Sequence, residues 1–333
     1  MTQPFDPSSL SMTEIIRLQT LLSQELARRF ERVAALAFTD IVDSAGYFAQ
    51  FGDEAGRRLQ QLHFDLLDDC IAVHPGRVVD TAGDGAFAVF ATGQGAAQAM
   101  MALHNRVSLH NQSLPRPHQL SLRIGLHWGH VLTDDVHVTG DAVNLCARLA
   151  ATALPCELRL TRELFQELTP ELRRLCRPLG SVNLKGIARA VDAMALLWRD
   201  PVRFPSQAVV RESGERLVLP PHDTVCFGRG ETVDITTAHD VVLGLPNALA
   251  AKQISRRQFE LRSRAGGYVL KALSSQPTEV DGVSLQRDQE VPIRPGSSVR
   301  LAGVMTLDFV SPSLADMATI DETLCGPGVT SLP

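Results

Sequence analysis

Two different spacings of apolar and polar positions follow one another along the chain. Over residues 12–31 apolar side chains recur at helical spacing with charged residues opposite, which predicts an amphipathic helix. Residues 33–39 are small and apolar, as in a strand covered on both faces. Residues 52–73 and 93–110 return to helical spacing, and residues 119–132 alternate like a strand with one covered face. This part of the chain predicts a domain in the order β-α-β-β-α-β-α-β, with the helices on one side of a sheet.

The second part of the chain changes to short strands separated by turns, and no long amphipathic helix is expected there. The expected strands are 209–211, 216–219, 224–227, 258–262, 267–272, 298–302 and 305–310. This pattern is typical of a β-sandwich. We therefore predict a helical segment at 1–32, an α+β sandwich at 33–199, a proline-containing linker at 200–206, an all-β sandwich at 207–312 and a disordered tail at 313–333. The helix of the first segment needs a partner surface, either on its own domain or on a second copy of the chain.

Composition excludes several classes of function. The net charge is −5, which gives no overall attraction to nucleic acid or to an anionic membrane. No apolar run reaches the roughly 18 residues that span a bilayer, and no signal peptide is visible at the start. The 6 cysteines are scattered without a CxxC pair, which indicates reduced thiols and a cytoplasmic protein rather than a disulfide framework or a zinc site.

Two aspartates stand where predicted strands end. Asp40 stops the apolar run at 33–39, and Asp84 lies in the glycine-rich turn 83–85 of a predicted β-hairpin. Either residue alone is more often an ordinary turn aspartate. Carboxylates on neighbouring strand ends can share hard divalent cations, and magnesium prefers one or two carboxylates plus substrate phosphates. The two aspartates are therefore a candidate metal site.

Two further segments strengthen the case that Asp40 and Asp84 have a functional role. Residues 140–149 include Asn144 and Arg148, which share one helix face at i, i+4 spacing. The other segment is 182–186. Together with the stretches around Asp40 and Asp84, these make four segments. In this order and at this spacing they resemble the catalytic domain of class III nucleotidyl cyclases, the adenylate/guanylate cyclase family, over about residues 33–198. The resemblance implies a ferredoxin-like α/β sandwich of the α+β class.

The resemblance also implies a reaction. In that reaction the ribose 3′-OH attacks the α-phosphate and pyrophosphate leaves, so the protein mainly aligns the groups and neutralises charge. Asp40 and Asp84, assisted by the Ile41 carbonyl, would hold two divalent cations, Mg²⁺ or Mn²⁺. Gly85 would let the chain turn tightly beside them.

A site shared between two chains is implied as well. Asn144 and Arg148 would stabilise the transition state, and Lys185 would neutralise the triphosphate. In the family one protomer supplies the metal-binding aspartates and the facing protomer supplies the asparagine and the arginine. Because this chain has both halves, a homodimer with two equivalent sites is expected.

The base pocket departs from the family pattern at Asp80 and His137. Adenylate cyclases usually carry lysine at the first position and aspartate or threonine at the second, and guanylate cyclases usually carry glutamate and cysteine. An ionised Asp80 accepts hydrogen bonds, which matches the adjacent N1–H and N2–H of guanine, and His137 could donate to guanine O6. Hydrogen-bonding logic therefore favours GTP, with ATP next and a pyrimidine nucleotide still open.

Three residues of the second domain form a candidate phosphate site. Arg229, Ser255 and Arg256 combine guanidinium and hydroxyl groups, which are good phosphate donors. With their neighbours they resemble a forkhead-associated (FHA) domain, a module that binds phosphothreonine. Two departures from that family stand nearby: Gln258 replaces a structural histidine, and Gln276-Pro277 replaces the usual asparagine of the ligand loop.

The whole chain thus resembles a cyclase whose output is regulated by a phosphothreonine-containing partner protein. Thr319 and Thr323 lie among acidic residues of the tail, and either could be phosphorylated and captured by an FHA domain. The alternative from another class is a catalytically silent cyclase fold that serves as a scaffold for phosphothreonine partners. The candidate catalytic residues favour an enzyme, because a scaffold needs none of them.

Overall fold

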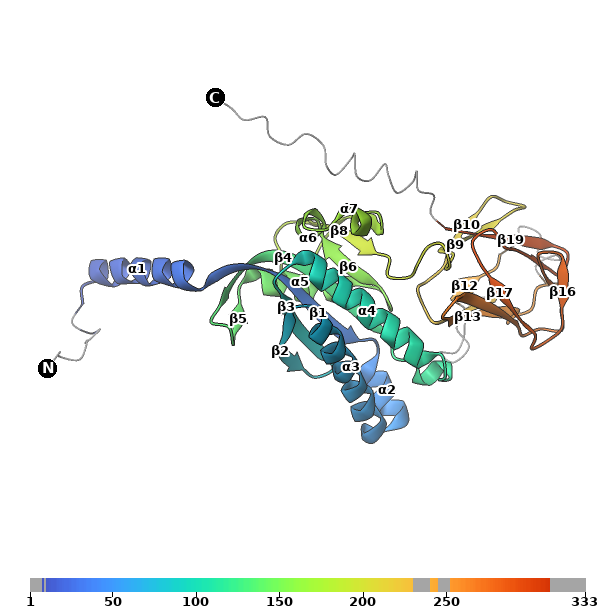
Figure 1. Ribbon diagram of the computed structural model, residues 1–333, viewed down its shortest axis with the longest axis horizontal. Helices are drawn as coiled ribbons and strands as arrows, with labels where there is room; N and C mark the ends of the chain where they lie inside the picture. Colours follow the sequence, from blue (N-terminus) through green and yellow to red (C-terminus); the bar gives the residue numbers. More distant parts are fainter. Residues whose placement is uncertain (1–7, 9, 230–239, 245–251, 312–333) are drawn as a thin grey trace, which may run out of the picture.

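A computed structural model covers the 333-residue chain, and it describes residues 8, 10–229, 240–244 and 252–311. The predicted tail at 313–333, with Thr319, Thr323 and Cys325, lies outside the described residues. Strands of one sheet occupy residues 31–196, and strands of two other sheets occupy residues 207–310 (Figure 1). The predicted linker at 200–206 lies between these two regions.

An eight-stranded sheet forms the frame of the first domain, in the order β2-β3-β1-β4-β6-β8-β7 with β5 beside β4. Neighbouring strands are antiparallel except β4 and β6, which are parallel. Its strands are β1 (Glu31–Ile41), β2 (Gly76–Ala82), β3 (Gly85–Phe90), β4 (Leu122–Thr133), β5 (Val138–Thr139), β6 (Leu158–Thr161), β7 (Cys176–Val182) and β8 (Val191–Leu196).

Helices connect these strands in the predicted alternation. They are α1 (Met12–Phe30), α2 (Ser44–Phe51), α3 (Asp53–Val73), α4 (Gly93–Asn111), the short 3₁₀ helix η2 (Arg116–His118), α5 (Asp141–Thr152), α6 (Arg162–Gln166) and α7 (Pro170–Arg173). The mixed α/β architecture predicted for this domain is therefore confirmed.

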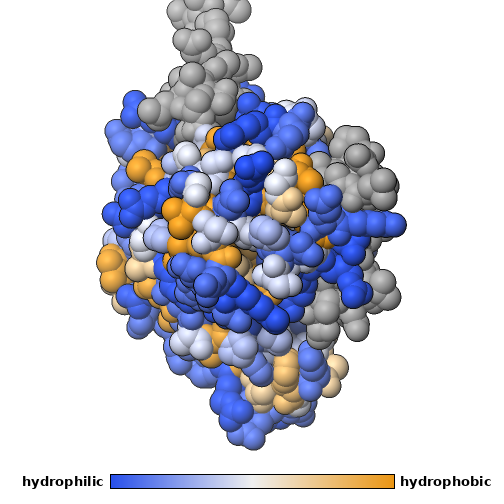
Figure 2. Space-filling model, turned by 90° about the vertical axis from the view of Figure 1, so that its right-hand side faces the viewer, coloured by the Kyte–Doolittle hydropathy of each residue, from blue (hydrophilic) through white to orange (hydrophobic). Residues whose placement is uncertain are grey.

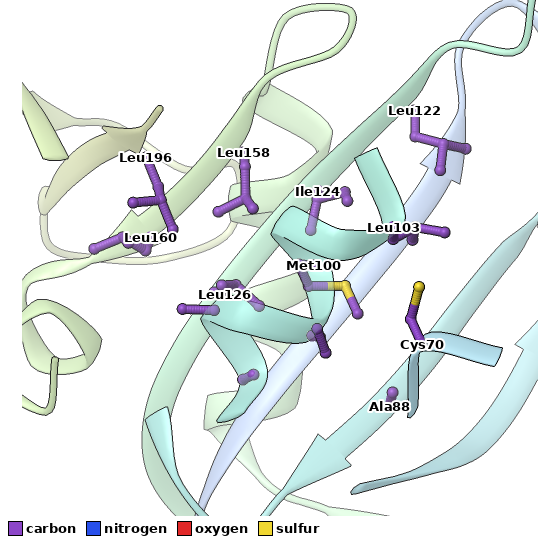
Figure 3. Close-up of a cluster of buried hydrophobic side chains, with 14 of the residues drawn as sticks. Cys70, Ala88, Met100, Leu103, Leu122, Ile124, Leu126, Leu158, Leu160 and Leu196 are labelled. Atoms are coloured by element: carbon purple, nitrogen blue, oxygen red, sulfur yellow. The ribbon is translucent and has the colours of Figure 1, made fainter. Parts of the chain in front are cut away.

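The helices cover both faces of the sheet, so the prediction that they lie on one side was wrong. Alternate residues of β1 and β4, such as Ala37 and Ile124, enter the main core together with α3 and α4 (Figure 3). The intervening Leu36 packs with Cys146 of α5 instead. Because successive strand side chains point to opposite faces, α5 covers the face that α3 and α4 leave open.

Glycine at 125 lets α5 lie directly on the backbone of β4. A Cβ atom added to Gly125 would stand 2.5 Å from the backbone nitrogen of Ala150. The thiol of Cys146 also approaches the Gly125 carbonyl oxygen at 3.3 Å. The helix that carries Asn144 and Arg148 is thus fixed by close packing against the central sheet.

Helix α1 projects away from the domain that follows it (Figure 1). It begins at a capping box in which the Ser11 backbone donates to Glu14 at 2.8 Å, and it spans Met12–Phe30, close to the predicted 12–31. None of its residues is buried, and the side chains of Leu21 and Leu22 are more than half exposed. The helix therefore does not pack into the core of its own domain.

The second domain is a sandwich of a six-stranded sheet and a five-stranded sheet, as predicted. Figure 2, seen from this side, shows a largely polar surface with scattered apolar side chains. Its strands are β9 (Gln207–Val210), β10 (Arg216–Val218), β11 (Thr224–Gly228), β12 (Val241–Val242), β13 (Phe259–Arg264), β14 (Gly267–Ala272), β15 (Thr278–Val280), β16 (Val283–Leu285), β17 (Glu290–Ile293), β18 (Ser298–Leu301) and β19 (Met305–Val310). Four of them, β12, β15, β16 and β17, were not expected from the sequence.

A buried polar network joins the two domains. Asp223, just before β11, accepts hydrogen bonds from Asn111 of α4 at 2.7 Å and from Arg199 at 2.6 Å. The hydroxyl of Ser108 donates to the same carboxylate. Removing one partner would leave a buried charge uncompensated, so the network favours one relative placement of the domains.

Within the described residues, no helix combines the length and the apolar character that crossing a bilayer requires. Five cysteines of this part of the chain are free and buried, at positions 70, 146, 156, 176 and 226.

Candidate functional site

Asp40 and Asp84 come together at the end of the β1–β3 pair. Asp40 stands near the end of β1, and Asp84 lies in the turn that joins β2 to β3. The left-handed residue of that turn is Gly83, with φ of 64°, so the tight turn predicted at Gly85 is made at Gly83 instead. At Gly85 an added Cβ would meet the Thr39 carbonyl oxygen at 3.1 Å and Asp40 Oδ1 at 3.5 Å. The glycine therefore allows the two chain segments to approach closely.

Charge around Asp40 is balanced by an arginine that sequence reasoning missed. Arg123 of β4 donates through Nε to Asp40 Oδ2 at 2.7 Å. Burial raises the pKa of Asp40, the hydrogen bond from Arg123 opposes this shift, and the negative charge of Asp84 adds to it. Arg123 engages only Oδ2, whereas Oδ1 faces the Gly85 turn. Only the pairing of Asp40 with Arg123 across β1 and β4 reveals this contact.

His63 of α3 lies behind the two aspartates and was also missed. Its Nε2 is 2.9 Å from the hydroxyl of Thr39, and its Nδ1 is 3.1 Å from the carbonyl oxygen of Asp84. Burial lowers the pKa of His63 to about 4, although the bond to Asp84 opposes the shift, so the ring is neutral near pH 7. The helical spacing of residues 52–73 could have marked His63 as core-facing, but not its partners.

A pocket of about 710 Å³ opens next to Asp40 and includes the two candidate base-reading residues, Asp80 and His137. A β-bulge between Val78 and Asp80 shifts the register of β2 against β3. The backbone N–H of His137 donates to Asp134 at 2.7 Å, and such bonds lower the pKa of Asp134 to about 2. The His137 loop is therefore held by an ionised carboxylate, while its imidazole stays exposed.

Asn144, Arg148 and Lys185 belong to a different part of the surface. Asn144 and Arg148 are both exposed on α5, whereas the pocket is lined by other positions of that helix. Lys185 is exposed in the turn between β7 and β8, and the adjoining Leu184 packs with Leu149 of α5 in one cluster. The helix and the lysine turn therefore form a single packed unit.

The donor set at Asp40 and Asp84 fits a hard divalent cation. It offers two carboxylates close enough for the charge of one to raise the pKa of the other. The Ile41 side chain is buried in the main core, so only its backbone carbonyl could serve as a ligand. Hard cations of this kind prefer oxygen ligands, and these three groups supply only oxygen.

The candidate phosphate site of the second domain is organised by Gln258. This side chain is fully buried, and its Oε1 accepts from the backbone N–H of Ser255 at 2.8 Å. Its Nε2 donates to the Gln276 carbonyl oxygen at 3.2 Å and to the Thr278 hydroxyl at 3.0 Å. Gln258 thus ties the Ser255 loop to the loop that contains Gln276, so a histidine is not needed for that connection.

Two of the three predicted phosphate donors meet beside this glutamine. The Arg229 backbone N–H donates to the Ser255 carbonyl oxygen at 3.1 Å, which joins the end of β11 to the Ser255 loop. Among the described residues, the buried Nε of Arg229 has no hydrogen-bond partner. Arg256 follows in the same loop and is exposed. The three residues therefore stand on one joined pair of loops, where the hydroxyl of Ser255 bonds that of Ser274 and Arg256 faces solvent.

Comparisons with known proteins divide the chain in the same way. Residues 26–197 match the model of the adenylate and guanylate cyclase catalytic domain, and residues 225–302 match the model of the FHA domain. Among solved structures, an adenylate/guanylate cyclase/hydrolase from Silicibacter pomeroyi is similar, with a TM-score of 0.45 and 26% identity. That match covers 50% of this chain and 97% of the other.

Two curated relatives cover only parts of the sequence. A Rhizobium meliloti (strain 1021) protein, named as a candidate adenylate cyclase 3, is 28% identical over 236 residues, which are 67% of this chain and 40% of that protein. The serine/threonine-protein kinase pkn2 of Myxococcus xanthus is 28% identical over 133 residues, which are 40% of this chain and 16% of the kinase. The chain therefore spans less than half of the length of either relative.

Proposed function

Because the chain belongs to the family of adenylate and guanylate cyclase catalytic domains, we propose that it converts a nucleoside triphosphate into a 3′,5′-cyclic nucleotide and pyrophosphate. The active site is composed of two halves, each supplied by a different copy of the chain. One half holds Asp40, Asp84, Asp80 and His137, and the other holds Asn144, Arg148 and Lys185.

The separation of these halves within one chain is the observation that supports the proposal. The residues of α5 that line the pocket beside Asp40 are apolar. Asn144 and Arg148 stand on the exposed side of the same helix. A second copy related by a two-fold axis can bring its exposed helix face over the first copy's pocket, and the reverse contact forms at the same time. Two equivalent sites result.

Each group has a task set by its chemistry. Asp40, Asp84 and the Ile41 carbonyl would hold two divalent cations, Mg²⁺ or Mn²⁺, which would polarise the attacking and leaving oxygens. Arg123 holds Asp40 in place through Oδ2 and leaves Oδ1 toward the turn. From the partner, the guanidinium of Arg148 and the amide of Asn144 stabilise charge on the phosphate and orient the ribose, and Lys185 neutralises the triphosphate.

One assay tests the proposal as a whole. Purified protein is incubated with Mg²⁺ or Mn²⁺ and each of the four ribonucleoside triphosphates, and the cyclic product is resolved by chromatography. We expect pyrophosphate release coupled to a 3′,5′-cyclic nucleotide, fastest with GTP. A protein that binds phosphothreonine peptides but forms no cyclic product with any nucleotide would be a scaffold instead.

Base selection provides a specific prediction at Asp80. The carboxylate accepts from guanine N1–H and N2–H, and it lines the pocket together with His137. In Asp80→Asn, the amide can donate to adenine N1 and accept from its amino group, so the ratio of kcat/KM for GTP over ATP should fall about 10- to 100-fold. Competition assays with both nucleotides measure this ratio. An unchanged ratio would exclude Asp80 from base recognition.

The FHA domain binds a phosphothreonine-containing protein through Arg229, Ser255 and Arg256 and thereby regulates the cyclase.

The contacts between the two domains that support this regulation begin at Asp240, which precedes β12. Its carboxylate accepts from the Cys226 backbone at 2.8 Å and from Arg116 of η2 at 2.6 Å. Burial opposes ionisation, but hydrogen bonds from His222 and Cys226, with the charge of Arg116, hold the pKa of Asp240 below its ordinary value.

From Arg116 the contacts continue to the metal-binding end of β1. His118, in the same 3₁₀ turn, is hydrogen-bonded to the hydroxyl of Tyr47 at 3.1 Å. The centroid of its ring lies 4.4 Å from the ring centroid of Phe51. Both aromatic residues belong to α2, which begins directly after the Asp40 turn. A ligand that shifts the end of β11 can therefore move α2 through packed groups.

Arg116→Ala should abolish the effect of a phosphothreonine peptide on the cyclase rate without weakening peptide binding. Arg229→Ala should instead weaken binding itself about tenfold or more, because a charge-assisted phosphate contact is lost. Arg211, whose exposed ion pair with Asp308 lies within the sandwich, gives the control Arg211→Ala. Fluorescence anisotropy measures binding, and cyclic product measures the response. A normal response in Arg116→Ala would disprove this coupling.

A further inference from the structure

We infer that His63 is a positioning residue that fixes the two aspartate-bearing segments relative to each other. The inference rests on the proposed metal site, and it assigns a role to a side chain that touches neither substrate nor metal. It follows from the two hydrogen bonds of the ring, from the complete burial of His63 and from the place of its partners in the chain.

The partners of His63 are a proposed metal ligand, Asp84, and the residue next to the other one, Asp40. Nε2 is 2.9 Å from the hydroxyl of Thr39, the residue immediately before Asp40. Nδ1 is 3.1 Å from the backbone carbonyl of Asp84 itself. One ring therefore connects the end of β1 to the β2–β3 turn, which are remote from each other in sequence.

The chemistry of these partners determines which nitrogen carries the proton. A carbonyl oxygen only accepts, so Nδ1 carries the hydrogen and donates it to Asp84. Nε2 is then an acceptor, and the hydroxyl of Thr39 donates to it. Both bonds are directional and use the two ends of a rigid ring. The imidazole thereby adds a rigid link between Thr39 and Asp84 to the strand pairing that sets Thr39 opposite Ala86.

The side from which His63 acts explains why it does not obstruct the pocket. Successive strand side chains point to opposite faces, so Thr39 points toward the helix layer while Asp40 points toward the pocket. His63 is 0% exposed on α3, whose Leu67 and Cys70 are part of the main core. The ring holds both segments from behind, and a ligand has free access from the front.

His104 gives a comparison within the same helical layer. It is almost fully buried on α4 and stacks on Trp198 at 5.0 Å, but its Nε2 has no partner among the described residues. That histidine has one hydrogen bond, to the backbone of Glu157, and none to an aspartate-bearing segment. His63 differs because both of its nitrogens are hydrogen-bonded, and both bonds go to the aspartate-bearing segments.

Three substitutions separate the two bonds. His63→Asn places an amide nitrogen at the same number of bonds from Cα as Nδ1, so it can keep the donor to Asp84. Thr39→Val removes the other bond with almost no change of shape. His63→Phe keeps a ring but removes both bonds. We expect Mn²⁺ affinity, measured by electron paramagnetic resonance without nucleotide, to fall about 10- to 100-fold in His63→Phe and less in the other two.

Steady-state kinetics provides the second measurement. Loss of positioning should lower kcat and raise the Mn²⁺ concentration that gives half of the maximal rate, with KM for the nucleotide at saturating Mn²⁺ changed less. The control is His104→Gln, which also removes a buried imidazole and should lower thermal stability without changing Mn²⁺ affinity. If His63→Phe does not fold, Thr39→Val and His63→Asn still test the bonds one at a time.

The outcomes distinguish this inference from the proposed function. If wild-type protein neither binds Mn²⁺ nor forms a cyclic product, the proposed function fails. If wild-type protein does both, and the variants at His63 and Thr39 retain its Mn²⁺ affinity and kcat, His63 is only a core residue and the inference is overturned. A selective loss of Mn²⁺ affinity in these variants, but not in His104→Gln, supports it.

Discussion

Asp84→Asn should reduce cyclase activity about 10²- to 10³-fold, the effect of removing one preorganised electrostatic contact from an active site. The substitution keeps the shape of the side chain and the backbone carbonyl that bonds to His63. It removes one of the two negative charges that hold the cations. Asp84 is a better choice than Asp40, because a change at Asp40 would leave Arg123 without its carboxylate.

The measurement is the rate of cyclic product over a range of Mn²⁺ and Mg²⁺ concentrations. Asp135→Asn is the matched control, because Asp135 is an exposed carboxylate in the loop that carries His137. Its backbone is left-handed, with φ of 69°, which asparagine tolerates well. We expect the control to behave like the wild type. More than a tenth of wild-type activity in Asp84→Asn at saturating metal would be incompatible with Asp84 as a metal ligand.

Elements with a full period of apolar side chains were predictable from the sequence. The helix expected at 52–73 is found at Asp53–Val73, and the strand expected at 267–272 has the same bounds in the structure. The strands that were missed, such as Val241–Val242 and Thr278–Val280, are too short to show an alternation. The side of the sheet that α5 covers was mispredicted, because spacing along the chain does not determine which face a crossover helix reaches.

The candidate site shows the same limit. Asp40 and Asp84 could be proposed from sequence, since each follows a recognisable strand and turn signal. Arg123 and His63 could not, because their contacts depend on strand register and on which face of α3 meets β1. Similarly, the sequence presents Gln258 as a departure from the FHA pattern. Only its three hydrogen bonds show that a glutamine can link the same loops.

The shared site leads to the second prediction, which concerns mixed dimers. A chain with Asp84→Asn and a chain with Arg148→Ala should each be nearly inactive alone, since every site in either dimer lacks one essential group. In a mixed dimer, the intact carboxylates of one chain face the intact helix of the other. One site of two is then complete, so purified mixed dimers should regain about half of the wild-type rate.

Two affinity tags, one on each chain, allow mixed dimers to be isolated and their subunit ratio to be verified. The matched control combines Asn144→Ala with Arg148→Ala. Both changes affect the helix half of the site, so each site of this mixed dimer still lacks a helix group and activity should stay low. Recovery in the first pair and not in the second would place the carboxylates and the guanidinium of one active site on different chains. Failure of verified mixed dimers to recover would mean that Asn144 and Arg148 serve the pocket of their own chain, or none.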